Sequence, residues 1–256
     1  TIFSTVSFDT KGVDEIASQT VGYTDKAVKP ENPENYPYDF MGWYTSSDGG
    51  ETLSENPFDF ESEITEDVKL YAKWEIHATA ADAADKINAM QKSDTVFVSG
   101  EITSDTIKEI ETAINARTFG IDLDLSDTTG LTSIGSSAFY GCENLKSIHM
   151  PEKLEKIGMF AFYHCKKLGN ITIPDSVIGI GKTAFAGCES FTSITIPKNV
   201  TSTQSYTFSL FYGCSNLKSV NILTTKLPLR VGMFSECKNL ESITWTVSFL
   251  SSILLV

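Results

Sequence analysis

Residues 134–151 read IGSSAFYGCENLKSIHMP, residues 157–174 read IGMFAFYHCKKLGNITIP, and residues 180–197 read IGKTAFAGCESFTSITIP. These stretches are copies of one pattern, and the cysteines extend it along the C-terminal half of the chain. Gaps of 23, 23, 26 and 23 residues separate Cys142, Cys165, Cys188, Cys214 and Cys237. A fixed period of about 20 to 50 residues is the signature of a fold built from stacked repeats. We therefore predict a solenoid with one coil per cysteine.

Each copy places apolar residues at fixed offsets from its cysteine. A phenylalanine lies three residues before the cysteine, a leucine or phenylalanine lies three after it, and two further apolar residues lie six and eight after it. The last two flank one polar residue, so a short strand points two side chains inward and one outward. A single coil cannot cover its own apolar face, so several coils must stack. The repeat phenylalanines are Phe139, Phe162, Phe185, Phe211 and Phe234.

The rest of each repeat predicts a turn and a return path. A proline directly follows three of the strands, at Pro151, Pro174 and Pro197, where its missing amide hydrogen ends a ladder without loss of a bond inside it. A second line of apolar pairs then leads into a glycine turn before the next phenylalanine. The pairs are Leu131 with Ile134, Leu154 with Ile157, and Val177 with Ile180.

The cysteines admit three interpretations. Stacked strands lie about 4.8 Å apart, which a disulfide between adjacent coils tolerates, although parallel side-chain vectors would strain it. A metal site lacks support, because no C-x-x-C pair exists and His77, His149 and His164 do not share a repeat column. Cysteine is often buried simply as a small apolar residue. We favour a structural column of buried free thiols.

The repeat closely resembles the BspA-like leucine-rich repeat of bacterial surface proteins over roughly residues 121–245. The resemblance implies a right-handed solenoid with a parallel sheet along one face, extracellular display, and binding of host or neighbouring-cell proteins. The pattern departs at residues 198–211, where three residues are inserted, and at residues 223–231. We expect a bulge on the return side there.

Residues 1–76 form a strand-rich segment in which STVSFDT, YDFMGWYT and DVKLYAKW are separated by turn residues. The segment resembles the Listeria and Bacteroides repeat, or internalin B-repeat, although Lys11, Gly12 and Val13 replace its paired glycines. The resemblance implies a small β-grasp-like module that acts as a spacer or accessory binding unit, and Trp43 and Trp74 are interpreted as core. The matching residues are Phe8, Asp9, Pro30, Pro33, Phe40, Gly42, Trp43, Tyr44, Leu70, Tyr71, Ala72 and Trp74.

Residues 77–130 are predicted to cap the solenoid. Residues 81–92 and 104–117 have helical spacing, the second with Ile107, Ile110 and Ile114 on one stripe and Ser104 or Asp105 as N-cap. A strand-like run follows each helix, and the exposed end of a repeat array needs such an atypical unit. The predicted fold is therefore an α+β/β leucine-rich-repeat solenoid over residues 131–256, an α/β cap, and a small β-grasp-like domain over residues 1–76.

Composition and chain ends limit the function classes. The net charge of −13 repels nucleic acid, and residues 1–75 carry most of it, with 16 acidic residues against 5 lysines. The start at Thr1 without methionine or signal peptide indicates a piece of something longer. The apolar run 249–256 is far shorter than the roughly 20 residues of a membrane helix, so we expect no membrane insertion. It is left open whether the segment after Trp245 is a capping strand, an arbitrary end of the expressed piece, or an exposed sticky edge that promotes self-association.

No constellation of residues predicts catalysis, and no cofactor is implied. Gly181, Lys182 and Thr183 mimic the end of a phosphate-binding loop, but Ser176 stands where that loop needs a glycine. Asp122, Asp124 and Asp127 alternate with leucines and are interpreted as the outward side of a strand instead of a calcium site. We expect a non-enzymatic protein.

The candidate ligand-binding residues are the outward side chains of the repeat strands, which we call the front face. The short hydroxyl and amide groups suit a host or neighbouring-cell surface or matrix protein, or a glycan, bound by a monomer. Threonine also simply fits an exposed strand, so a stalk that only displays another domain is the alternative. Tyr140, Tyr163 and Tyr212 suggest a second, aromatic column. The first row of the front face is His149, Thr172, Thr195, Asn221 and Thr244, and the second row is Ser147, Asn170, Ser193, Ser219 and Ser242.

Overall fold

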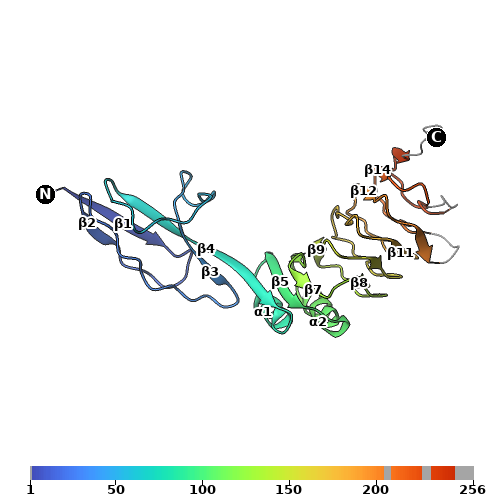
Figure 1. Ribbon diagram of the computed structural model, residues 1–256, viewed down its shortest axis with the longest axis horizontal. Helices are drawn as coiled ribbons and strands as arrows, with labels where there is room; N and C mark the ends of the chain where they lie inside the picture. The colour runs from blue at the N-terminus through green and yellow to red at the C-terminus, as the bar shows by residue number, and fades with distance from the viewer. Residues whose placement is uncertain (1, 205–208, 227–231, 246–256) are drawn as a thin grey trace. The chain divides into compact units, whose positions relative to one another are not determined.

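A computed structural model describes residues 2–204, 209–226 and 232–245 (Figure 1). The chain forms two compact units, Thr1–Ile76 and His77–Val256. The segment after Trp245, for which the sequence leaves three interpretations open, lies outside the described residues.

The first unit is one mixed sheet with the strand order β2-β1-β4-β3. Strand β1 (Phe3–Asp9) pairs antiparallel with β2 (Gln19–Gly22) and parallel with β4 (Val68–Thr79), and β3 (Asp39–Tyr44) pairs antiparallel with β4. Trp43 is 1% exposed and fills the core, with the rings of Phe8 and Phe40 edge-on to it at 5.0 and 5.3 Å. Lys11 and Gly12 both take positive φ in the turn after β1. The described residues of this unit form strands and no helix.

The second unit begins with two helix–strand pairs. Helix α1 (Ala83–Ala89) precedes β5 (Thr95–Glu101), and helix α2 (Ser104–Asn115) precedes β6 (Ile121–Asp124), which pairs parallel with β5. The N-cap of α2 is Thr103, so the expectation of Ser104 or Asp105 is wrong by one or two residues. Thr103 has the extended backbone of a cap, and its hydroxyl accepts a hydrogen bond of 3.2 Å from the Thr106 amide.

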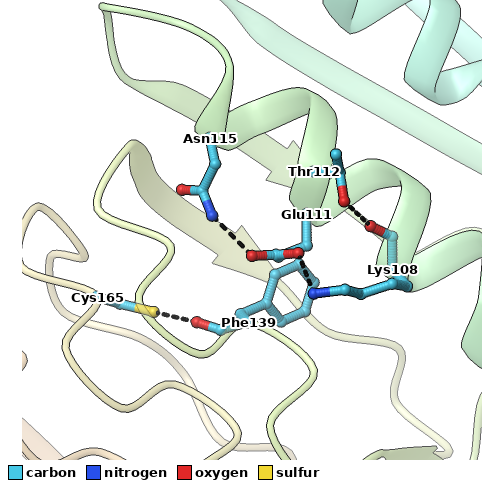
Figure 2. A network of polar contacts seen from close by, with 6 residues as sticks. All are labelled: Lys108, Glu111, Thr112, Asn115, Phe139 and Cys165. Atoms are coloured by element: carbon cyan, nitrogen blue, oxygen red, sulfur yellow. Dashed lines mark hydrogen bonds and ion pairs between the residues drawn. The ribbon is translucent and has the colours of Figure 1, made fainter.

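Helix α2 carries a buried carboxylate (Figure 2). Glu111 is 5% exposed, and its two oxygens accept hydrogen bonds from Lys108 Nζ at 2.7 Å and from Asn115 Nδ2 at 2.6 Å. The carboxylate lies beside the ring of Phe139, the first repeat phenylalanine. A carboxylate this deeply buried is tolerated because both of its oxygens are paired. The cap thus covers the end of the core with a satisfied polar group.

The remaining chain winds into parallel coils, which confirms the predicted solenoid. The front strands form the ladders β5-β6-β9 and β12-β14-β15, and the return strands form the ladder β8-β10-β11-β13. The short β7 (Thr128–Thr129) pairs with β5. The other strands are β8 (Ser133–Ile134), β9 (Leu145–His149), β10 (Lys156–Ile157), β11 (Gly179–Gly181), β12 (Ser193–Ile196), β13 (Ser202–Gln204), β14 (Ser219–Ile222) and β15 (Ser242–Trp245).

Aromatic stacking runs through the solenoid core. The rings of Phe139, Phe162, Phe185, Phe211 and Phe234 stack in sequence, with centroids 5.4 to 5.8 Å apart and planes within 7° of parallel. The first four are fully buried. This column repeats the predicted inward position of the repeat phenylalanine in every coil.

The cysteines are free thiols beside this column, and each of the last four donates a hydrogen bond to the preceding coil. The acceptor is the backbone carbonyl of the preceding repeat phenylalanine, at 3.0 to 3.2 Å from Sγ. Burial raises the pKa of Cys214 to about 12 and that of the half-buried Cys237 to about 11, because the thiolate would lose its hydration. A thiol therefore satisfies a carbonyl inside the core, which no aliphatic side chain could do.

An asparagine ladder, which the sequence analysis missed, ties the coils together at their surface. Two residues after the cysteine, Asn216 and Asn239 each donate from Nδ2 to a carbonyl of the preceding coil at 2.8 Å. Asn144 does the same to the carbonyl of Arg117 at the end of the cap. The signal is in the sequence as C-E-N-L, C-S-N-L and C-K-N-L.

The front ladder is interrupted in the second coil, where the sequence predicts a strand at Ile171 and Ile173. Both side chains are buried as expected, but residues 169–174 form no strand. In the later coils, the amides of Lys218 and Ser219 bind the backbone carbonyl of Thr192. The equivalent amides of Thr192 and Ser193 instead bind Asn170 Oδ1, at 2.8 and 3.0 Å. A side-chain oxygen has replaced a backbone carbonyl in the ladder.

The expected bulges fall largely outside the described residues. The interrupted stretches 198–211 and 223–231 contain residues 205–208 and 227–231, of which nothing is described. Before the first gap, β13 keeps regular parallel register with β11. The bulge itself stays a prediction.

The glycine that follows the apolar pair of the return strand sets the distance between coils. A Cβ added to Gly158 would lie 2.5 Å from the Ser136 nitrogen, and one added to Gly181 would overlap the backbone of Gly158 and Met159. Gly135 holds the same repeat position in the first coil, and its Cβ would meet nothing within 4 Å. Backbone atoms cannot yield as a flexible side chain can.

We predict that Gly158→Ala and Gly181→Ala each lower the free energy of unfolding by about 1 to 3 kcal/mol or more, because two coils must separate. Gly135→Ala, the matched control, is expected to stay within about 0.5 kcal/mol of the parent. Urea denaturation followed by circular dichroism measures all three. Equal effects at the three positions would contradict the close backbone approach.

The thiol bond gives a second prediction. Cys188→Ala removes both packed volume and the hydrogen bond to Phe162, so we expect a loss of about 2 kcal/mol. Cys142→Ala is the control, because among the described residues its Sγ makes no bond to a repeat phenylalanine, and it should cost about 1 kcal/mol less. If a urea titration found both variants equally unstable, the hydrogen bond donated by the thiol would not contribute to stability.

Candidate binding face

The front strands bring the predicted surface residues into two straight rows. Thr195 pairs with Asn221 and Asn221 with Thr244, while Ser193, Ser219 and Ser242 are paired in the same way. Thr195 and Thr244 are exposed, and Asn221 is half-buried. Because parallel register repeats without offset, like positions of successive coils lie side by side.

The two rows extend beyond the predicted residues into the cap. Asp124 pairs with His149 in the first row and with Phe97 on its other side, and Asp122 pairs with Ser147 in the second row. The strand of residues 95–101 was not predicted to be part of the face. Its alternation in TVFVSG was the available signal, since Val96 and Val98 are buried and leave Phe97 on the opposite side.

Acidic and basic groups meet at this N-terminal end of the face. Asp122 accepts from Ser147 Oγ at 2.5 Å and pairs with Lys146 at 2.8 Å, and Asp124 lies 3.1 Å from His149 Nδ1. Burial by itself would raise the pKa of Asp124, but hydrogen bonds from Ser126 and the neighbouring His149 lower it below the usual range. The Asp124 carboxylate therefore carries charge at neutral pH, and both carboxylates have hydrogen-bonding or ionic partners within the face.

The second coil differs from its neighbours in chemistry as well as in backbone. The amide of Asn170 is committed internally, since Oδ1 accepts from two backbone amides and Nδ2 donates to Thr192 Oγ1 at 2.9 Å. Thr172, in contrast, is exposed. Of the predicted residues, Ser147, His149 and Asn170 are thus bound within the face, and Thr172, Thr195 and Thr244 offer exposed side chains.

The remaining motifs form no recognisable reactive site. Gly181 lies in β11, and Thr183 is buried with φ of 59° in a turn, so a helix does not follow as a phosphate-binding loop requires. Over the described ranges, no three His, Cys, Asp or Glu side chains lie together as metal ligands would. A helix with the length and apolarity to cross a bilayer is likewise not found among these residues.

Comparison with known families finds a match in each unit. Residues 132–253 match the BspA type leucine rich repeat region, in six copies, and residues 5–73 match the Listeria-Bacteroides repeat domain. The solenoid is thus similar to the BspA type repeats, and the first unit is similar to the Listeria-Bacteroides repeat domain. Both resemblances drawn from the sequence are confirmed.

Individual relatives are similar to parts of the chain. A leucine rich cell surface protein of Faecalibacterium prausnitzii A2-165 is 33% identical, with a TM-score of 0.42. The matched region is 47% of this chain and 31% of that protein. The leucine rich repeat protein of T. pallidum is 32% identical and covers 48% and 58%, with a TM-score of 0.43. A protein of Evansella cellulosilytica, provisionally named a membrane protein, is 39% identical over 74 residues, 28% of this chain. The chain spans 10% of the length of that curated relative.

The Asn170 bonds predict the effect of substitutions at that position. Asn170→Ala should expose the amides of Thr192 and Ser193 to exchange, whereas Asn170→Asp keeps an acceptor oxygen in the same place and should preserve their protection. Amide hydrogen exchange followed residue by residue tests this. Equal protection in the parent and the alanine variant would show that another acceptor fills the ladder.

Proposed function

We propose that this chain is part of an adhesive or ligand-display protein of a bacterial surface, and that the solenoid binds a protein or glycan of a host or neighbouring cell through its front face. The observation that carries this proposal is the pair of rows that run in unbroken register from β12 to β15. The first-row residues Thr195 and Thr244 are exposed there. A rigid row of hydroxyl and amide groups needs little ordering on binding, which favours affinity.

The front face combines aromatic, acidic and hydroxyl groups, which supports a partner with both apolar and polar surface. Phe97, half-buried, and His77, exposed, stack with centroids 5.0 Å apart near the acidic end of the rows. An aromatic pair beside carboxylates and hydroxyls is a composition that protein and glycan partners both use. The proposal includes no catalytic role.

The alternative is a stalk that spaces another domain and binds nothing itself. The internal bonds of Ser147, His149 and Asn170 favour it, since side chains that are satisfied within the face gain less from a ligand. A pull-down of host matrix proteins and surface glycans by the chain separates the two, because a stalk should retain none of them specifically.

The front face is tested directly by the triple variant Thr172→Glu, Thr195→Glu and Thr244→Glu. We expect it to fold and to lose captured partner by about tenfold or more, because three bulky charges would interrupt the first row. Thr132→Glu with Thr201→Glu is the matched control, since both threonines are exposed beside the return strands. Unchanged capture by the triple variant, with circular dichroism like that of the parent, would reject the face.

A further inference from the structure

Two repeat positions take positive φ in every coil, one of them two places before the repeat phenylalanine and the other two places after it. The residue two places after the repeat phenylalanine has a positive φ between 58° and 72° in all five coils. Gly141, Gly187 and Gly213 suit that conformation, whereas His164 and Glu236 hold it despite the strain that a Cβ causes. Strained residues of this kind gather at functional sites.

The two strained residues border the same hollow. A depression of about 370 Å³ is lined by His164 and Glu236, with Gly187 and Gly213 of the intervening coils also in its lining. The ring of His164 extends over Gly187, where an added Cβ would lie 2.7 Å from it. Two consecutive glycines between two side chains therefore leave an open space on the surface of the solenoid.

An unstacked tyrosine forms part of the wall. In the first two coils, Tyr140 and Tyr163 stack on each other with centroids 5.0 Å apart. In the third coil, Ala186 replaces the tyrosine, so Tyr212 of the fourth coil has no tyrosine beneath it and is 46% exposed. Tyr212 is thus a part-exposed aromatic residue in the lining of the hollow.

Hydrogen-bond donors and acceptors both line the hollow beside Tyr212. Glu189, Ser215, Glu236 and Lys238 line the hollow, and Glu236 pairs with Lys238 at 3.5 Å. Within the described residues, the Glu189 carboxylate forms no ion pair. Two carboxylates disfavour an anionic ligand, and carboxylate, hydroxyl and ammonium together match a ligand that both donates and accepts hydrogen bonds.

We propose that this hollow binds one pyranose ring of a neutral saccharide, with an apolar face of the sugar against Tyr212 and its hydroxyls bonded to Glu189, Glu236 and Lys238. The volume suits a single small ring at the lower end of ligand sites, and tyrosine combines a flat apolar surface with a polar tip. The hollow lies between the return and front strands of the coil and does not depend on the front face.

The test uses the full chain labelled with ¹⁵N and three probes: methyl β-glucopyranoside, methyl β-galactopyranoside and the methyl glycoside of N-acetylglucosamine. At least one probe should shift the amide resonances of Gly187 and Gly213 saturably in the millimolar range. Tyr212→Ala should raise that Kd by about tenfold or more, through loss of the stacking surface.

Tyr140→Ala is the matched control, because it removes an equally placed tyrosine that is 51% exposed and lies outside the lining of the hollow. It should leave Kd unchanged, as should the triple threonine variant of the front face. No shift of either glycine with any probe overturns the proposal. The proposal is also overturned if a folded Tyr212→Ala variant still binds the probe, or if Tyr140→Ala loses binding equally. A stronger shift of these amides by an unrelated peptide than by any of the three probes overturns it too.

Discussion

The structure depends on the fact that no coil of this chain can bury its own apolar side. Each phenylalanine is covered by the phenylalanine of the next coil, and each thiol from Cys165 onward bonds the carbonyl of the coil before it. The contact is the same at every step, so stability is a sum over neighbouring coils. The cap with its buried Glu111 ends the array on one side.

Regular stacking also explains what the surface offers. Any residue type that recurs at one repeat position becomes a straight row, and any departure becomes a local feature. The threonine and serine rows arise in the first way. The break at Asn170 and the hollow between His164 and Glu236 are local departures. Each arises from single residues that differ from those at the same repeat position in other coils. In such a fold, local surface features come from substitutions within an otherwise constant frame.

Much of the fold could be predicted because period and alternation record burial directly. The inward phenylalanines, cysteines and paired aliphatics followed from spacing alone. The replacement of a strand by the Asn170 side chain could not, because it depends on one oxygen that reaches two amides of the next coil. The contribution of Phe97 to the face was missed for a related reason, since only the pairing of β5 with β6 places it beside Asp124. Sequence patterns report which side a residue faces, and less often which neighbour it meets.

Thiol reactivity tests the central claim of inward stacking most directly. With a thiol-specific reagent at mildly alkaline pH, the native chain should show slow, partial reaction at the half-buried Cys237 alone, since burial raises the pKa of the thiols and blocks access to the other four. The same chain in denaturant should yield five reactive thiols. Rapid reaction of three or more cysteines in the native protein, or fewer than four in denaturant, would contradict the stacked column.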